Sequence, residues 1–238
     1  PREFLNFGTN INYSNAIRNA GTDLYSTAIG QFPLATPYDA NGNFLLNPGA
    51  DDQVFNPLND PNTVFDETRS NRLLANIFGQ VNILKGLSYR AAFGVDVNST
   101  RRGRFNGAVS SVRRNAAANA NYDTGNGLVW TLQNQINYDI TIADKHDFSA
   151  TVVQELRKRR DEESFSSAQE LTYESQRWYA LQNNAKGVTE VSGNYLQDQL
   201  ASHLGRINYS YNKKYILSAA LRHDVSSRLS PQNQSLHF

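Results

Sequence analysis

Residues 200–229, LASHLGRINYSYNKKYILSAALRHDVSSRL, contain two alternating runs on either side of a short polar turn. In the second run the odd positions from Tyr215 to Val225 are mostly apolar, and the even positions are mostly polar. Successive side chains leave opposite faces of an extended backbone, so a period of two over this length predicts two long β-strands. One apolar face, one polar face, aromatic residues near the turn and lysines within it are typical of an outer-membrane barrel hairpin.

Composition excludes several classes of protein. The chain has no run of about 18 apolar residues, which excludes a transmembrane helix but not a barrel, where only alternate residues face lipid. A net charge of +1 gives no reason to expect a nucleic-acid partner. The absence of cysteine excludes disulfides and thiolate metal sites. Methionine and a signal peptide are also absent, and we expect a segment of a longer, processed protein.

The same alternation predicts five more strands before the final hairpin, at 4–14, 72–84, 87–98, 128–142 and 146–156. Turns of a few residues follow the second, fourth and sixth strands, and long loops follow the first, third and fifth. Loops this long far exceed the usual median of about 4–6 residues. Short turns on one side and long loops on the other are typical of outer-membrane barrels, with the turns in the periplasm and the loops outside.

The three long loops are predicted at 15–69, 99–126 and 157–198. The third is expected to contain a helix from Ala168 to Asn183. Ser167 and Glu170 have the spacing of a capping box, in which each side chain satisfies a free amide at the start of a helix.

A soluble β-sandwich would show the same alternation, so other features must separate the two folds. The predicted strands have about 11–15 residues, whereas globular strands cluster near about 5–6. Twelve residues tilted by about 40° rise roughly 30 Å, enough to cross an apolar band of about 25 Å. Lysine is expected only in turns and loops, and tyrosines and Trp130 fall near strand ends, as in two interfacial belts.

We therefore predict an all-β fold, a partial antiparallel transmembrane β-barrel over residues 1–238 with long extracellular loops and one short loop helix. Seven strands cannot close without leaving unpaired edges in lipid, so further strands are expected outside this chain.

Two segments, 71–97 and the final hairpin, resemble the SusC/RagA family of TonB-dependent outer-membrane transporters. The family pattern in the hairpin reads L-G-R-x-N-Y-x-Y, K-Y and R-x-D-G-S-S-R-F. The matching residues are Leu204, Gly205, Arg206, Asn208, Tyr209, Tyr211, Lys214, Tyr215, Arg222, Asp224, Ser226, Ser227 and Arg228. Val225 stands in place of the family's glycine and Leu229 in place of its phenylalanine, so the loop after this strand can differ.

The resemblance implies a barrel of roughly 22 strands that is filled by an N-terminal plug and energised through TonB. It also implies a SusD-type surface lipoprotein as a lid over the extracellular loops, and oligosaccharides or peptides as cargo. The plug and the TonB-contacting segment would lie outside this chain.

Candidate functional residues fall on the polar face and in the loops. Six polar-face residues would face the lumen and could contact plug or cargo: Arg90, Asp96, Arg206, Asn208, Arg222 and Asp224. The alternative is a lattice of ion pairs within the barrel wall. Four loop aromatics could contact cargo or lid: Trp178, Tyr179, Phe32 and Tyr38. For Trp178 the alternative is that Leu171, Trp178 and Leu181 dock the helix on the barrel rim.

Other motifs give no sign of catalysis. The basic runs 101–104 and 157–160 are interpreted as solvated loop residues or lipopolysaccharide contacts rather than a nucleic-acid site. Residues 39–43 are expected to form a turn, because their glycine comes too early for a calcium loop. The four histidines, at 146, 203, 223 and 237, lack metal-ligand spacing. We expect no metal, no cofactor and no enzymatic activity.

The first functional hypothesis is active import across the outer membrane of a Gram-negative, Bacteroidetes-type bacterium. The second is a non-transporting outer-membrane barrel, such as an adhesin or a secretion component, whose loops bind a protein. A soluble carbohydrate-binding β protein is the third.

Overall fold

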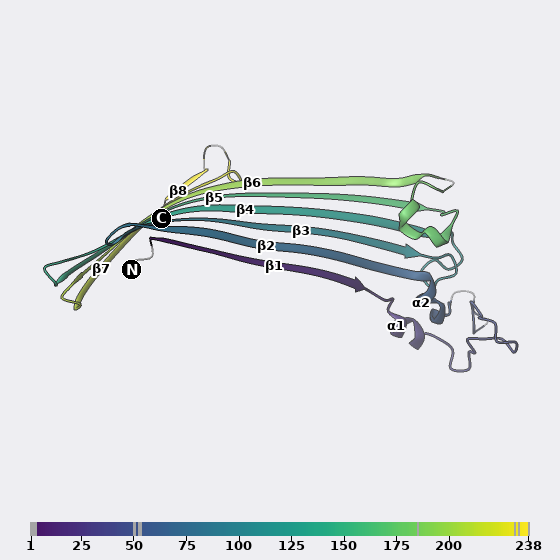
Figure 1. Cartoon of the computed structure of the whole chain (residues 1–238). Helices are drawn as coiled ribbons and strands as arrows, with labels where there is room; N and C mark the ends of the chain where they lie inside the picture. Colours follow the sequence, from purple (N-terminus) through teal and green to yellow (C-terminus); the bar gives the residue numbers. More distant parts are fainter. Residues whose placement is uncertain are drawn as a thin grey trace.

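The computed structural model describes residues 4–49, 51, 54–184, 186–230, 232 and 234–237, and they form one eight-stranded antiparallel sheet (Figure 1). The strands are β1 (Leu5–Asn19), β2 (Val64–Leu84), β3 (Leu87–Asn106), β4 (Asn119–Ile142), β5 (His146–Gln169), β6 (Val188–Tyr211), β7 (Tyr215–Ser226) and β8 (Ser235–His237). Each strand pairs with its neighbour in the sequence, in the order β1 to β8. The all-β prediction is confirmed, and the short strand β8 is an addition to it.

Helices are few and short. They are α1 (Leu24–Ile29), the 3-10 helix η1 (Pro57–Asn59), α2 (Asp60–Thr63) and the 3-10 helix η2 (Glu174–Ala180). Asp23 caps the start of helix α1, and its carboxylate accepts a hydrogen bond from the backbone N–H of Ser26 at 3.2 Å. No helix in the described part of the chain is long and apolar enough to span a membrane.

The register places apolar residues on one face of the sheet and polar residues on the other. Val95 of β3, for example, lies between Ala75 of β2 and Trp130 of β4. Among the described residues no second layer covers the apolar face over most of its length, and Leu217 and Ile207 are 68% and 59% exposed. An uncovered apolar face of this extent is incompatible with a soluble sandwich, whose inner faces pack together.

Strands β1 to β6 are longer than predicted, and the added residues lie at their long-loop ends. Strands β4, β5 and β6 each contain 24 residues. The connections between β3 and β4 and between β5 and β6 shrink to 107–118 and 170–187. On the apolar face of β3 the sequence changes from Val97 to Ser99 and Arg101, yet pairing continues to Asn106. The alternation of apolar and polar residues therefore located only the lower part of each strand.

Two further loop predictions are wrong for the same reason. The basic run 101–104 lies in β3 and the run 157–160 in β5, so neither is a loop segment. Lys158 consequently lies on a strand, contrary to the expected confinement of lysine to turns and loops.

The predicted helix at 168–183 is also wrong. Ser167 pairs with Glu190 within the β5–β6 ladder, and Glu170 follows the strand with a left-handed φ of 58°. Only residues 174–180 are helical, as a 3-10 helix that is kinked at Arg177. The apolar spacing that suggested a helix instead serves to pack this segment against the sheet.

The small core of the described residues lies where η2 packs on the long-loop end of the sheet. Trp178 is 6% exposed. Its neighbours in the core are Phe105, Ala118, Ala120, Ala168 and Leu181, with Phe65, Tyr122 and Leu171 at the edge. The indole lies over Gly103, where an added Cβ would overlap it. The guanidinium of Arg177 stacks 3.4 Å above the ring of Phe65. Trp178 therefore docks its segment on the sheet, as the alternative prediction stated. The docked segment is the 3-10 helix η2 and not the longer helix that was predicted.

We predict that Gly103→Ala will release the η2 segment, because the new methyl group and the indole of Trp178 cannot occupy the same space. Overpacking of this kind costs about 1–3 kcal/mol, so trypsin cleavage at Arg177 or Lys186 should accelerate by about tenfold. Gly125→Ala is the control, since nothing lies within 4 Å of a Cβ at that glycine. Equal cleavage rates in the two variants would contradict the packing described.

Candidate functional site

The six predicted polar-face residues do share one face, but they form two groups. Arg90 and Asp96 lie on β3, whereas the other four lie on β6 and β7, with β4 and β5 between the groups. The two groups share a face because polar positions of neighbouring strands lie opposite one another in the register, as Arg90 of β3 does with Gln135 of β4. The sequence thus predicts their common face, but they do not form a single cluster.

Three of the six belong to local ion pairs. Arg72 Nε and Nη2 donate to the two carboxylate oxygens of Asp96 at 3.0 and 2.7 Å. Arg222 Nε donates to both carboxylate oxygens of Asp224 at 2.9 and 3.0 Å. The Arg72 and Arg222 side chains are about half exposed, so water screens both pairs. These contacts fit the lattice alternative.

The other three differ in how they are held. The guanidinium of Arg90 lies 3.8 Å above the ring of Phe78, a cation–π contact. Asn208 donates from Nδ2 to Ser149 Oγ at 3.2 Å. Arg206 is exposed and has neither a hydrogen bond nor an ion pair within the described residues. Arg206 and Arg90 are therefore the two charged residues of the six without an ionic partner among the described residues, and Arg206 also lacks a ring contact.

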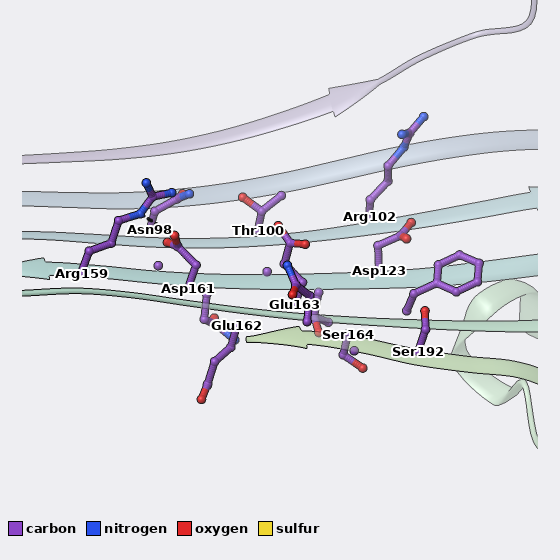
Figure 2. A pocket seen from close by; sticks show the side chains of 17 residues that line it. Asn98, Thr100, Arg102, Asp123, Arg159, Asp161, Glu162, Glu163, Ser164 and Ser192 are labelled. Carbon is purple, nitrogen blue, oxygen red and sulfur yellow. Dashed lines mark hydrogen bonds and ion pairs between the residues drawn. The ribbon is translucent and has the colours of Figure 1, made fainter. Parts of the chain in front are cut away.

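A pocket that the sequence analysis missed lies on the polar face of the outer halves of β3 to β6, with a volume of about 550 Å³ (Figure 2). One row of the sheet crosses it, because Thr100 pairs with Gly125, Gly125 with Glu163, and Glu163 with Asn194. The space above Gly125 is open, since no atom lies within 4 Å of the position of a Cβ there. A glycine in an otherwise side-chain-bearing row makes the hollow.

Charges around the pocket are mostly paired. Arg159 Nε donates to Asp161 at 2.5 Å within β5, and Figure 2 shows the next residue, Glu162, pointing the opposite way. At the side of the pocket next to β2, Arg102 pairs with Asp66 at 2.5 Å. Glu163 has no ion pair or hydrogen bond among the described residues, so the pocket has an unbalanced negative charge. Residues 157–163 are all charged, so no alternation of apolar and polar residues marked this part of β5 in the sequence.

The loop aromatics are split by the structure. Trp178 is buried in the core, whereas Tyr179 is 65% exposed. Phe32 and Tyr38 are also exposed, at 57% and 50%. Tyr38 pairs with Phe44 in an isolated bridge, with the two rings edge-on at 6.4 Å. Three of the four candidates can therefore reach a partner molecule, and Trp178 cannot.

The segment between Tyr38 and Phe44 is the predicted turn. Asp39 Oδ1 accepts hydrogen bonds from the backbone N–H groups of Asn41 and Asn43, each at 2.8 Å. The side chain of Asn43, and then its backbone N–H, hold the pKa of Asp39 below its ordinary value. Gly42 has a left-handed φ of 82°, as a tight turn requires.

Two of the histidines are closer in space than their sequence spacing suggests. His203 and His223 are direct cross-strand partners, with ring centroids 6.2 Å apart. The side chain of the predicted His237 lies outside the described residues. His146 Nδ1 lies 2.8 Å from the hydroxyl of Tyr209. Within the described part of the chain, no group of three or more His, Cys, Asp or Glu side chains could hold a metal ion.

We predict that a double-mutant cycle on Arg72→Ala and Asp96→Ala will give a coupling energy below about 1 kcal/mol, because the pair is exposed. Urea unfolding of the full-length protein measures the free energies. A coupling of about 3 kcal/mol or more would mean that another domain desolvates the pair, contrary to a simple wall lattice.

No protein-family model matches the chain. Two curated proteins of Formosa agariphila are similar to it, TonB-dependent receptor P3 and TonB-dependent receptor P26. They are 26% identical over 219 residues and 27% identical over 238 residues, which covers 92% and 97% of this chain. The chain spans only 22% and 24% of the length of these relatives.

Solved structures of the RagAB peptide transporter share the fold. One matches 99% of the chain with a TM-score of 0.74 and 19% identity, and covers 28% of the solved chain. The closed-closed state of the RagAB peptide importer matches 99% with a TM-score of 0.77 and 19% identity. The open-open state matches 100% with a TM-score of 0.74 and 20% identity; each match covers 27% of its solved chain.

These likenesses agree with the single-layered antiparallel sheet, its uncovered apolar face and the motif in its last long hairpin. The resemblance seen in the sequence is confirmed: the chain is similar over nearly its whole length to TonB-dependent receptors, and its sheet has the fold of a β-barrel segment of the RagAB transporter.

Proposed function

We propose that the protein containing this chain imports oligosaccharides or peptides actively across the outer membrane, energised through TonB. The proposal is carried by one observation. The whole sheet matches the RagAB peptide transporter at TM-scores of 0.74–0.77, and the matched sheet leaves its apolar face uncovered. Residues 1–238 would be a segment of one transmembrane barrel domain, with the plug and the other strands outside this chain.

The apolar face meets lipid in this proposal, and the polar face lines the lumen. On β3 the lipid-facing apolar residues run from Leu87 to Val97, which is 11 residues. At about 3.3 Å per residue and a tilt of about 40°, these residues rise roughly 28 Å, close to the apolar band of outer-membrane barrels. The upper strand ends then stand above the membrane as a wall around the lumen entrance.

Cargo and partners are proposed from the same geometry. The RagAB importers are peptide importers by name, and the unbalanced carboxylate of Glu163 suits a cationic group on a peptide. A SusD-type lipoprotein would cover the long-loop end, where Phe32, Tyr38 and Tyr179 are exposed. TonB would act through a segment outside this chain. Nucleic acid is not expected, since most polar-face arginines near the pocket are paired with carboxylates.

We predict that spin labels at neighbouring positions 132 and 133 will report opposite environments in reconstituted full-length protein. Leu132 lies on the apolar face beside Phe93, and Gln133 lies on the polar face beside Ala92. A label at Leu132→Cys should be relaxed more by oxygen, which partitions into hydrocarbon. One at Gln133→Cys should be relaxed more by a water-soluble nickel chelate. A reversed pattern would invert the lumen assignment.

We predict that deletion of the TonB-contacting segment from the full-length protein will abolish accumulation of cargo and leave surface binding intact. Uptake is followed by mass spectrometry with isotope-labelled peptide digests and oligosaccharide mixtures, in cells that carry or lack the lid lipoprotein. Unchanged uptake would favour the alternative of a non-transporting barrel, such as an adhesin or a secretion component. Partition into buffer rather than detergent would favour a soluble β protein.

A further inference from the structure

Strand β6 loses its neighbour halfway along its length. It contains 24 residues, whereas β7 contains 12 and ends at Ser226. The last main-chain contact between them joins the N–H of Ser227 to the carbonyl of Gln199 at 3.0 Å. From 191 to 197 no described residue pairs with β6 on this side, and Figure 1 shows β6 as the last strand of the sheet at its long-loop end. The chain after β7 does not cover this edge, because β8 pairs with residues 223–225.

The open edge presents main-chain groups without partners. Gln199 shows their direction, because its N–H donates to Ser227 Oγ at 2.8 Å and its C=O accepts from the N–H of Ser227. Main-chain groups alternate in direction along a strand, so four more residues present theirs to the same side: Val191, Gly193, Tyr195 and Gln197. Within the described residues, none of these N–H and C=O groups has a main-chain hydrogen-bond partner.

The sequence of this edge lacks the features that usually prevent pairing. Native sheets protect exposed edges with lysine, proline, inward-pointing charges or bulges. Residues 191–197, VSGNYLQ, contain neither a charge nor a proline. The register shift of the β5–β6 ladder lies beyond them, between Ser167 and Ala168. The edge is therefore suited to pairing with an added strand.

The pocket of Figure 2 adjoins the open edge on the polar face. Ser192, Gly193 and Asn194 of β6 line the pocket, and Asn194 is the cross-strand partner of Glu163. A residue of an added strand in this row would lie two strand spacings, roughly 10 Å, from Glu163. The side chain of a lysine or arginine at that place, together with the glutamate side chain, spans this distance. The carboxylate of Glu163 has no ion pair among the described residues to compete with it.

These features fit an extended peptide better than a sugar chain. An extended peptide presents N–H and C=O groups on one side at every second residue, a repeat of about 6.6–6.8 Å that matches the edge of a strand. An oligosaccharide has no such repeat of donors and acceptors. The neighbouring ladders are all antiparallel, so the same direction is expected for the added strand.

We propose that an extended peptide binds antiparallel to the open edge of β6, residues 191–197, with a cationic side chain opposite Asn194 and close to Glu163. The inference rests on the proposed function and deepens it, because it makes the cargo a peptide and gives it a place at the lumen entrance. Main-chain pairing accepts many sequences, and the pocket favours those with a cation at one position.

The test uses detergent-solubilised full-length protein and a fluorescent nonapeptide of threonine, valine and serine with a central lysine. In the proposed geometry the lysine faces the pocket, so its own N–H points away from β6 and those of its two neighbours point toward β6. An isomer with N-methyl groups on the lysine and on the residues two before and two after it should bind like the unmethylated peptide. An isomer with three N-methyl groups on intervening residues should bind about 100-fold more weakly, at roughly fivefold for each lost hydrogen bond.

Substitution in the pocket tests the position of the cation. The unmodified protein should prefer the lysine peptide over the same peptide with a central glutamine by about fivefold, and Glu163→Gln should remove this preference. Glu162→Gln is the matched control, because Glu162 is the adjacent carboxylate of β5, points to the opposite face and pairs with Arg160. Its preference for lysine should stay within about twofold of that of the unmodified protein.

Hydrogen exchange reports on the edge itself. Residues 191–197 should exchange freely in the unliganded full-length protein and become protected when the unmethylated peptide binds. Equal or reversed affinities of the two isomers, or no binding of the unmethylated peptide, would overturn the inference. Protection before the peptide is added would also overturn it, because another segment of the protein would then occupy the edge.

The failure of the inference can be told apart from the failure of the proposed function. Cells that accumulate labelled peptides although the edge stays unprotected would contradict only the inference. Cells that accumulate neither peptides nor oligosaccharides would contradict the proposed function. The comparison of the two isomers needs no variant and so does not depend on variant folding.

Discussion

Main-chain hydrogen bonding in hydrocarbon is the constraint on which this structure depends. An unpaired N–H or C=O group in lipid costs on the order of several kcal/mol. Every strand must therefore be hydrogen-bonded along its length to a neighbouring strand. The ladders from β1 to β7 meet this demand in strict sequence order. The register shifts of the β2–β3 and β5–β6 ladders occur near strand ends, between Asn82 and Leu84 and between Ser167 and Ala168.

Because the backbone ladder holds the sheet together, the side chains of the two faces can serve different solvents. The wall has almost no interior, and its described core is confined to the place where Trp178 and Leu181 pack near one end. Ion pairs such as Arg72–Asp96 remain exposed and add little stability. They keep the polar face hydrated and electrically balanced. An exception such as Glu163 or Arg206 is therefore informative about what that face contacts.

The upper third of the sheet has a different physical role. Above the apolar band the continuous apolar stripe ends, so strand pairing there must be supported by local packing or by ion pairs. The η2 segment supplies packing through Trp178 over Gly103, and Arg102 with Asp66 supplies a cross-strand pair. In this zone the wall has a pocket on its polar face, and Arg69 and Arg101 lie opposite each other on the other face. Binding chemistry is thus concentrated beyond the hydrocarbon, where charged groups cost least.

The sequence by itself determined the antiparallel barrel wall, the faces of the strands and the positions of the short turns. A period of two is a local property, and burial in lipid enforces it from Leu87 to Val97. The same period of two assigned six residues to one face of the sheet: Arg90, Asp96, Arg206, Asn208, Arg222 and Asp224.

Only the tertiary structure decided where the strands end, because pairing above the membrane depends on neighbouring strands rather than on an apolar stripe. For that reason residues 101–104 and 157–160 were mistaken for loops, and 168–183 for a helix. The pocket at Gly125 and the pairing of Arg69 with Arg101 join residues distant in sequence. Cross-strand register creates such neighbours, and it is fixed by the whole ladder rather than by any one segment.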